Sequence, residues 1–182
     1  MARQQFKALE THYRGYRFRS RTEARWAVFF DHPTIEIEWE YEPEGYRLPG
    51  GELYLPDFWL PQVSMFAEVK PGRSRSHAEI KSGERAKAVD LALVTGKPVL
   101  ILDGPPRETN YWAIWPPDSG FNAWTWVDVD MFDLHRYHLT EGRFYASTGA
   151  AELEHVPEHR SESAVHPAVE AARSARFDGR ER

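Results

Sequence analysis

Residues 53–70, LYLPDFWLPQVSMFAEVK, constrain the fold of this chain more than any other stretch. They contain two short apolar runs, rich in β-branched and aromatic residues, on either side of residues 61–64, a Pro-Gln-Val-Ser sequence typical of a hairpin turn. Alternate side chains of a strand share a face, so Glu68 and Lys70 are expected to project together from a mostly apolar strand. Antiparallel pairing across the turn would bring Asp57 to the same face.

Two carboxylates and an ammonium group on a rigid sheet suit metal-dependent phosphodiester chemistry. Mg²⁺ prefers carboxylate and carbonyl oxygens, so Asp57 and Glu68 are candidate ligands, with the Val69 carbonyl as a third. Lys70 would orient or deprotonate an attacking water and offset negative charge in the transition state. The alternative is a surface hairpin with a solvated pair between Glu68 and Lys70, worth well under about 1 kcal/mol. These residues alone leave both interpretations open.

A capping box predicts the first helix. Ser20 is expected at the N-cap, with Glu23 three positions later, and the helix is expected to end near Asp31, ahead of a proline. Glu23 falls on the same helical stripe as Trp26 and Phe30, which predicts that it lies along the buried face. Capping and a role in a metal site are compatible for this residue, and the pattern alone leaves both open.

The remaining elements predict an α/β core in the order helix, three strands, helix, strand. Residues 34–42 alternate apolar side chains with glutamates, which predicts a strand with a solvated glutamate row. A second capping box at Ser76 predicts a helix to about Thr95, with Ala86, Val89 and Leu93 buried. The continuous apolar run 97–103 then predicts a buried parallel strand reached by this helical crossover.

The C-terminal half predicts an extension of the sheet and a polar tail. Strands are expected within 111–115 and 123–129, with their tryptophans packing in the core or at the sheet edge. We expect one domain over 1–149, with its core at about 15–103 and an aromatic strand extension at 104–149. Residues 150–182 are poor in apolar side chains, so we expect a flexible or partly helical tail that buries little surface.

Composition and charge exclude several classes of protein. The chain has 0 Cys, which excludes disulfides and thiolate metal sites. No run approaches the roughly 20 apolar residues of a membrane span, and no export signal is apparent, so a cytoplasmic location without a membrane partner is expected. The net charge is −5, but residues 1–30 and 70–88 are basic and flank an acidic segment.

Such basic segments are expected to contact phosphates, although they also suit ordinary solvated helix faces. The candidate phosphate contacts are Arg14, Arg17, Arg19, Arg21, Arg73, Arg75 and Lys81.

Three segments together resemble a known superfamily: RSRTEARW at 19–26, LPDFW at 55–59 and AEVK at 67–70. They are similar to the PD-(D/E)xK nucleases, and within them to phage and bacterial enzymes akin to the endonuclease subunit of heteromeric transposases. The resemblance implies a restriction-endonuclease-like core with a mixed sheet in α-β-β-β-α-β order. The chain departs from the family pattern in having Pro71 directly after Lys70, and no separate DNA-binding domain is expected after the core.

The resemblance also implies a function. It implies a DNA endonuclease that uses Mg²⁺, with Mn²⁺ as a substitute, in a bacterial cell or a phage-infected host. The expected catalytic residues are Glu23, Asp57, Glu68 and Lys70, and the expected metal ligands are Asp57, Glu68, the Val69 carbonyl and Glu23. DNA is the expected partner, together with a second copy of the chain or a recombination or transposition protein. A ribonuclease and a non-catalytic nucleic-acid-binding or assembly subunit are the alternatives.

Overall fold

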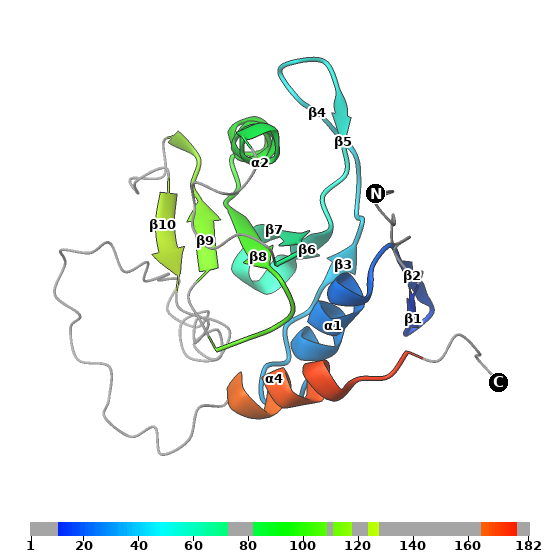
Figure 1. Ribbon diagram of the computed structural model, residues 1–182. Helices are drawn as coiled ribbons and strands as arrows, with labels where there is room; N and C mark the ends of the chain where they lie inside the picture. Colours follow the sequence, from blue (N-terminus) through cyan, green and yellow to red (C-terminus); the bar gives the residue numbers. More distant parts are fainter. Residues whose placement is uncertain (1–10, 73–81, 109–110, 118–123, 128–164, 178–182) are drawn as a thin grey trace, which may run out of the picture.

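The computed structural model describes residues 11–72, 82–108, 111–117, 124–127 and 165–177, and within these ranges the protein has a mixed α/β fold (Figure 1). The helices are α1 (Arg21–Phe30), α2 (Ser82–Thr95) and α4 (Val165–Ser174), with a 3₁₀ turn η1 (Pro61–Val63). The strands are β1 (Thr11–Tyr13), β2 (Tyr16–Phe18), β3 (Glu40–Tyr41), β4 (Tyr46–Arg47), β5 (Leu53–Tyr54), β6 (Phe58–Leu60), β7 (Met65–Lys70), β8 (Val99–Asp103), β9 (Tyr111–Ile114) and β10 (Trp124–Val127). None of the described helices is long and apolar enough to cross a bilayer.

The largest sheet of the described residues has the strand order β10-β9-β8-β7-β6-β3. Strands β7 and β8 are parallel, and the other neighbouring pairs are antiparallel. Helix α2 lies between β7 and β8 in the chain, so it provides the crossover that a parallel pair requires. The predicted hairpin of β6 and β7, the turn at residues 61–63 and the buried parallel strand β8 are therefore confirmed. The short hairpins β1–β2 and β4–β5 form separate two-stranded sheets.

The sheet lies between two helical layers. Helix α2 covers one face, and α1 with α4 beside it covers the other (Figure 1). The alternation of side chains along β8 contributes to both cores: Leu100 packs with α1 and α4, and Ile101 packs with α2. The aromatic residues Trp26, Phe30 and Phe58 fill the core on the α1 side. The strands are thus buried on both faces, as a sheet with a parallel central pair usually is.

The cap of α1 has the predicted geometry. The Ser20 hydroxyl oxygen accepts a hydrogen bond from the Glu23 backbone N–H at 3.1 Å, and its O–H donates to Glu23 Oε1 at 2.7 Å. The helix ends at Phe30 with Asp31 as its C-cap, as predicted. Trp26, Ala27 and Phe30 are fully buried, so the predicted apolar stripe faces the core. This cap fixes the start of α1, and with it the position of Glu23 relative to the sheet.

The continuous strand predicted over residues 34–42 is wrong. Only Glu40–Tyr41 pairs with a neighbouring strand, and Glu36 has a left-handed φ of 51° that interrupts an extended backbone. The N–H groups of Ile35 and Ile37 donate instead to carbonyls of His32 and Phe30, at the end of α1. The alternation in burial nevertheless holds, because Ile35 and Ile37 are buried while the neighbouring glutamates are exposed.

The predicted buried stripe of α2 is also wrong. Ala86, Val89 and Leu93 are exposed, and the helix buries Ala88, Leu91 and Ala92 instead. Apolar side chains occur on several sides of this helix, so more than one stripe satisfies the helical period. The stripe with two alanines packs against the sheet, which allows a close approach of helix and strands. The expected helix start at Ser76 lies outside the described residues.

Part of the expected tail belongs to the core. The predicted helix near the C-terminus is present as α4, but it packs against α1 and does not lie free. Val165, Ala168, Val169 and Ala172, spaced as one helical stripe, are buried in the same core as α1. The low apolar content of 150–182 concealed this short stripe, so the expectation that the whole segment buries little surface is wrong for Val165–Ser174.

Candidate functional site

Three carboxyl groups are buried close to one edge of the sheet. Glu23, Asp57 and Glu68 are 8%, 6% and 3% exposed, and they are the buried acidic side chains of the described residues. They come from the first turn of α1, the residue before β6, and β7. Burying a carboxylate is costly unless it is hydrogen-bonded, paired with a cation or protonated. The partners of each group therefore indicate what the cluster can do.

Asp57 and Glu68 lie on neighbouring strands. The β6–β7 register pairs Phe58 with Ala67, and its continuation by one residue places Asp57 opposite Glu68. Asp57 Oδ2 accepts a hydrogen bond from the Val69 N–H at 2.8 Å, which anchors the side chain to β7. Burial, followed by the negative charges of Glu68 and Glu23, raises the pKa of Asp57 to about 8. Two of the predicted catalytic carboxylates are thus close enough to repel each other.

Glu68 has the least satisfied carboxylate of the three. Its Oε2 accepts a long hydrogen bond of 3.4 Å from Lys70 Nζ, and its buried Oε1 has no hydrogen-bond partner in the described structure. Burial raises the pKa of Glu68, although the positive charge of Lys70 opposes the shift. The Tyr54 hydroxyl lies beside this carboxylate and, as a hydrogen-bond donor, also opposes the rise in the pKa of Glu68. The Tyr54 pKa is itself raised, first by burial and then by Glu68, so this phenol stays protonated.

Glu23 is fully hydrogen-bonded. Its Oε1 accepts from the Ser20 hydroxyl, and its Oε2 accepts from the Tyr41 hydroxyl at 2.7 Å and from the Arg19 backbone N–H at 3.0 Å. The predicted capping role of Glu23 is therefore confirmed. Its buried position next to Asp57 is also as predicted, but a direct bond to a metal would require one of these hydrogen bonds to be exchanged. Tyr41 was not recognised from the sequence as a site residue.

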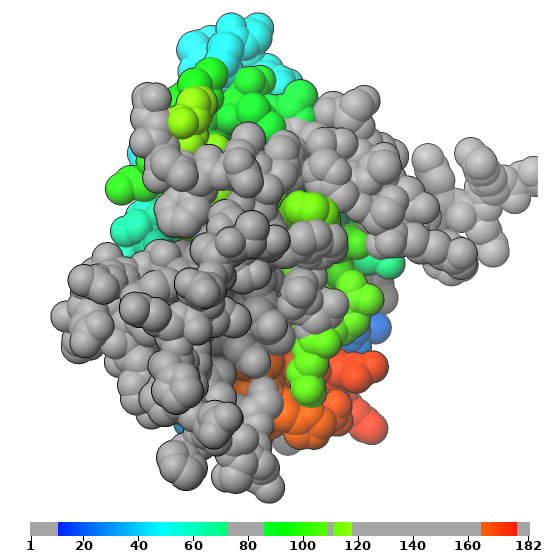
Figure 2. Space-filling view, turned by 90° about the vertical axis from the view of Figure 1, so that its left-hand side faces the viewer, coloured from blue at the N-terminus to red at the C-terminus, as the bar shows by residue number. Residues whose placement is uncertain are grey.

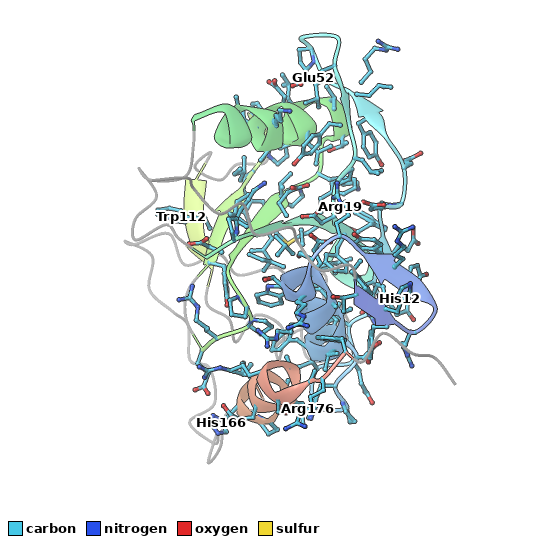
Figure 3. All side chains as sticks on the ribbon, turned by 45° about the vertical axis from the view of Figure 1, so that its right-hand side comes forward. His12, Arg19, Glu52, Trp112, His166 and Arg176 are labelled. Carbon is cyan, nitrogen blue, oxygen red and sulfur yellow. The ribbon has the colours of Figure 1, made fainter. Side chains whose placement is uncertain are left out.

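Arg19 bridges the acidic groups through its side chain and backbone. One guanidinium nitrogen lies 2.6 Å from Asp57 Oδ1, and Nε lies 2.8 Å from Glu42 Oε1. Glu42 N–H donates to the Asp57 carbonyl, so Glu42, Asp57 and Glu68 form a row across three strands. The side chain of Arg19 is 57% exposed and lies where the β1–β2 hairpin meets the sheet (Figure 3). Sequence reasoning assigned Arg19 to phosphate contacts, and treated Glu42 as part of a solvated row.

The other predicted contact residues are scattered. Arg14 forms an ion pair with Asp31 at 2.7 Å, away from the carboxyl groups. Arg17 is exposed on β2, and Arg21 is exposed at the start of α1. Val69 contacts the carboxyl cluster through its backbone N–H, which donates to Asp57, and the role of its carbonyl as a metal ligand stays a prediction. The predicted residues Arg73, Arg75 and Lys81 lie outside the described ranges.

The residues present fit a hard divalent cation in chemistry but do not form a complete cage. Glu68 Oε1 is a buried carboxylate oxygen without a partner, and Asp57 Oδ1 is held by an exposed guanidinium. Oxygen donors of this kind suit Mg²⁺ and Mn²⁺. Within the described ranges, however, no group of three or more His, Cys, Asp or Glu side chains is arranged closely enough to hold a metal. Asp57 and Glu68 are thus the two ligands that the structure can offer directly.

The comparisons with known proteins give no family: no family model matches this chain, and no curated protein matches it.

Proposed function

We propose that this protein is a Mg²⁺-dependent DNA endonuclease with a restriction-endonuclease-like core. The observation that carries the proposal is the cluster of buried carboxyls, in which Asp57 and Glu68 lie opposite each other with Lys70 beside Glu68. Two acidic groups with raised pKa values in one buried place favour a function over a purely structural role, because a stable core avoids such repulsion. The motifs at 19–26, 55–59 and 67–70 support the same class.

Each residue then has a distinct part. Asp57 and Glu68 would hold Mg²⁺, or Mn²⁺ in its place, with the Val69 carbonyl as a further candidate and Glu23 supporting directly or through water. When bound, the ion supplies a water of lowered pKa and neutralises charge on the phosphate. Lys70, which is 14% exposed and already within 3.4 Å of Glu68, would orient the attacking water and offset negative charge. Arg19 would release Asp57 and contact the phosphate backbone with its exposed guanidinium.

One observation favours a second candidate function. Arg19 already neutralises Asp57, and a third metal ligand is not in place among the described residues, which also suits a nucleic-acid-binding subunit that does not cut. A second copy of the chain or a recombination or transposition protein would then complete the assembly. A ribonuclease on the same fold is the other alternative. The proposed site residues would contact phosphate and metal rather than the sugar hydroxyl, so only a direct comparison of DNA and RNA substrates separates the two.

The test is cleavage of supercoiled plasmid and of branched DNA, with a parallel RNA substrate, in Mg²⁺, Mn²⁺ or EDTA. Asp57→Ala and Lys70→Ala are expected to abolish cutting, because they remove a ligand and the group that positions the water. Glu38→Ala and Lys97→Ala remove exposed residues of the same types and are expected to cut like the native protein. DNA binding without cutting in any metal would refute the independent nuclease and support the binding subunit.

A further inference from the structure

A second feature of the molecule lies on another side of α1, where this helix meets the end of α4. A pocket of about 340 Å³ opens there, between the first half of α1 and the residues that follow α4. It is lined by Arg21, Arg25, Arg173, Ser174, Ala175, Arg176 and Phe177. Four of these lining residues are arginines and none is acidic. In a chain with a net charge of −5, such a concentration of positive charge requires an explanation.

The fold brings these arginines together from distant parts of the chain. Arg21 and Arg25 are four residues apart and therefore share one face of α1. Arg173 lies in the last turn of α4 and Arg176 just beyond it, and the apolar stripe of α4 fixes this end of the helix against α1. Like charges on neighbouring helices repel each other, so the arrangement is unfavourable until an anion enters.

Within the described ranges, acidic side chains do little to neutralise these arginines. Among the described residues, no ion pair joins Arg21, Arg25 or Arg176 to a carboxylate, and Arg173 has an exposed ion pair with Glu170 at 3.8 Å. The Nε of Arg25 is buried and has no hydrogen-bond partner in the described part of the chain. A buried donor without an acceptor is rare in folded proteins and points to a ligand that supplies one. Arg25 thus lines the open pocket and also carries a buried donor without an acceptor.

The missing group has the chemistry of a phosphate. Guanidinium groups bind phosphate oxygens through paired hydrogen bonds, and several of them can surround one tetrahedral anion. The volume of about 340 Å³ is at the small end of ligand sites, which suits a phosphate with an adjoining sugar better than a large ligand. Free polyphosphate and a nucleic-acid backbone both carry this group.

The position of the pocket favours the nucleic-acid backbone. Glu23 lies between Arg21 and Arg25 in sequence but points to the carboxyl cluster, so the pocket and the cluster lie on different sides of one helix. An α-helix is about 10 Å across with its side chains. Backbone phosphates of one DNA strand follow at about 3.4 Å along the helix axis, so a strand that passes around α1 needs more than the roughly three nucleotides that the width of the helix alone would take. A strand engaged at the carboxyl cluster can therefore reach the pocket.

We propose that the arginine pocket binds a backbone phosphate of the nucleic-acid strand on which the carboxyl cluster acts. The identity of that strand rests on the proposed function; the pocket itself rests on its four arginines and the unpartnered Arg25 Nε. Arg25, Arg173 and Arg176 are thus nucleic-acid contacts in this proposal, together with Arg21. Of the four, Arg21 alone was a candidate from the sequence. The pocket positions the strand, and it takes no part in the chemistry.

The test measures DNA binding as a function of salt, in EDTA, so that no cutting interferes. The double variant Arg173→Gln with Arg176→Gln removes two exposed charges from the pocket. It is expected to weaken binding of a short duplex about tenfold and to reduce the slope of log K against log salt by about 1 to 2. The matched control, Arg47→Gln with Lys97→Gln, also removes two exposed charges, and it is expected to bind like the native protein. Figures 1 and 2 show that the β4–β5 hairpin, which carries Arg47, and α4 lie at opposite ends of the molecule.

A second variant and a second ligand complete the test. Arg25→Gln is expected to weaken DNA binding similarly, and circular dichroism checks that each variant is folded. Inorganic pyrophosphate raises the melting temperature of any protein that has a free phosphate site. Pyrophosphate could stabilise the native protein but neither pocket variant, while the variants bind DNA as the native protein does. That result would overturn the nucleic-acid assignment in favour of a free phosphate. Pocket variants that bind DNA like the control, or a native protein that does not bind DNA at all, would overturn the proposal.

Cleavage is measured separately from this binding. Pocket-dependent binding without any cutting would sink the nuclease and leave the pocket in place. If the native protein cuts DNA and the pocket variants bind DNA as well as the native protein does, the nuclease is supported and the phosphate pocket is refuted.

Discussion

Replacing Glu68 by Gln is expected to stabilise the metal-free protein at pH values above neutral. The carboxyl group is 3% exposed, its Oε1 has no partner in the described structure, and burial raises its pKa. Gln has nearly the same shape, and its carbonyl oxygen can still accept the hydrogen bond from Lys70. The substitution therefore removes a buried negative charge while it keeps the packing of β7.

The magnitude follows from two opposing effects. Burying an ionised carboxylate costs more than burying an amide of the same shape, which favours the variant by about 1–3 kcal/mol, and against this the variant loses the charge interaction with Lys70, which is long at 3.4 Å. The net gain is expected to be about 1 kcal/mol in the free energy of unfolding. In a chain of 182 residues this raises the melting temperature by about 2–4 °C.

The gain has a definite dependence on pH. Because the pKa of Glu68 is raised in the folded state, the unfolded chain ionises first as the pH rises past the usual value of 4.5. The native protein therefore loses stability above that pH, whereas the Gln variant does not. Below it, Glu68 is protonated in both states and the two proteins should melt alike as far as this residue is concerned.

The assay is thermal unfolding in EDTA, followed by circular dichroism at about pH 3.5 and about pH 8, on either side of the pH at which the unfolded Glu68 ionises. Glu38→Gln, at an exposed position, is the matched control and is expected to leave the melting temperature unchanged at both pH values. Adding Mg²⁺ should then stabilise the native protein more than Glu68→Gln. A variant that melts below the native protein at pH 8, or a difference that is the same at both pH values, would refute the reasoning.

Two further substitutions test the surroundings of the site. Arg19→Gln removes the cation held 2.6 Å from Asp57. Because the Arg19 side chain is 57% exposed, the free energy of unfolding measured in urea is expected to fall by about 1 kcal/mol. This loss should shrink in Mn²⁺ if a metal ion takes over the charge of Asp57. Gly72→Ala would place a Cβ 2.7 Å from the Gly104 Cα at a φ of 73°, so the free energy of unfolding is expected to fall by at least about 1–2 kcal/mol. Gly50→Ala, where a Cβ would meet nothing within 4 Å, is the control and should have little effect. Equal urea midpoints for the two alanine variants would contradict this prediction.

Local sequence patterns predicted the parts of the fold that depend on neighbouring residues. The capping box at Ser20 gave the start of α1 because both of its hydrogen bonds form within four residues. The hairpin of β6 and β7 was predictable because the turn and the alternation lie in one stretch, and this also gave the pairing of Asp57 with Glu68. Three of the site residues could thus be placed before any tertiary contact was known.

The elements that were predicted wrongly depend on distant partners. The face that α2 buries is chosen by the sheet, since its sequence allows more than one apolar stripe. The backbone N–H groups of residues 35–37 donate to carbonyls at or just after the end of α1 rather than to a strand, and the alternating pattern does not show this local exception. The packing of α4 on α1 joins segments that are far apart in the sequence. The pairing of Arg19 with Asp57 also joins distant segments, so no pattern in the sequence indicated it, and the expected contact of Arg19 with phosphate stays a prediction.

The three buried carboxyls differ in a way that bears on their purpose. Both oxygens of Glu23 are hydrogen-bonded by the protein, which is what a structural carboxylate needs. Asp57 has one firm backbone partner and one exposed arginine that can leave. Glu68 has the ammonium of Lys70 at 3.4 Å and the Tyr54 hydroxyl as neighbours, and its Oε1 has no hydrogen-bond partner in the described structure. If stability alone had shaped the cluster, Glu68 would be the first residue to be replaced by an amide or an apolar side chain. Under the proposed function a bound cation would supply what the protein leaves out, and the stability of Glu68→Gln and its response to Mg²⁺ measure that contribution directly.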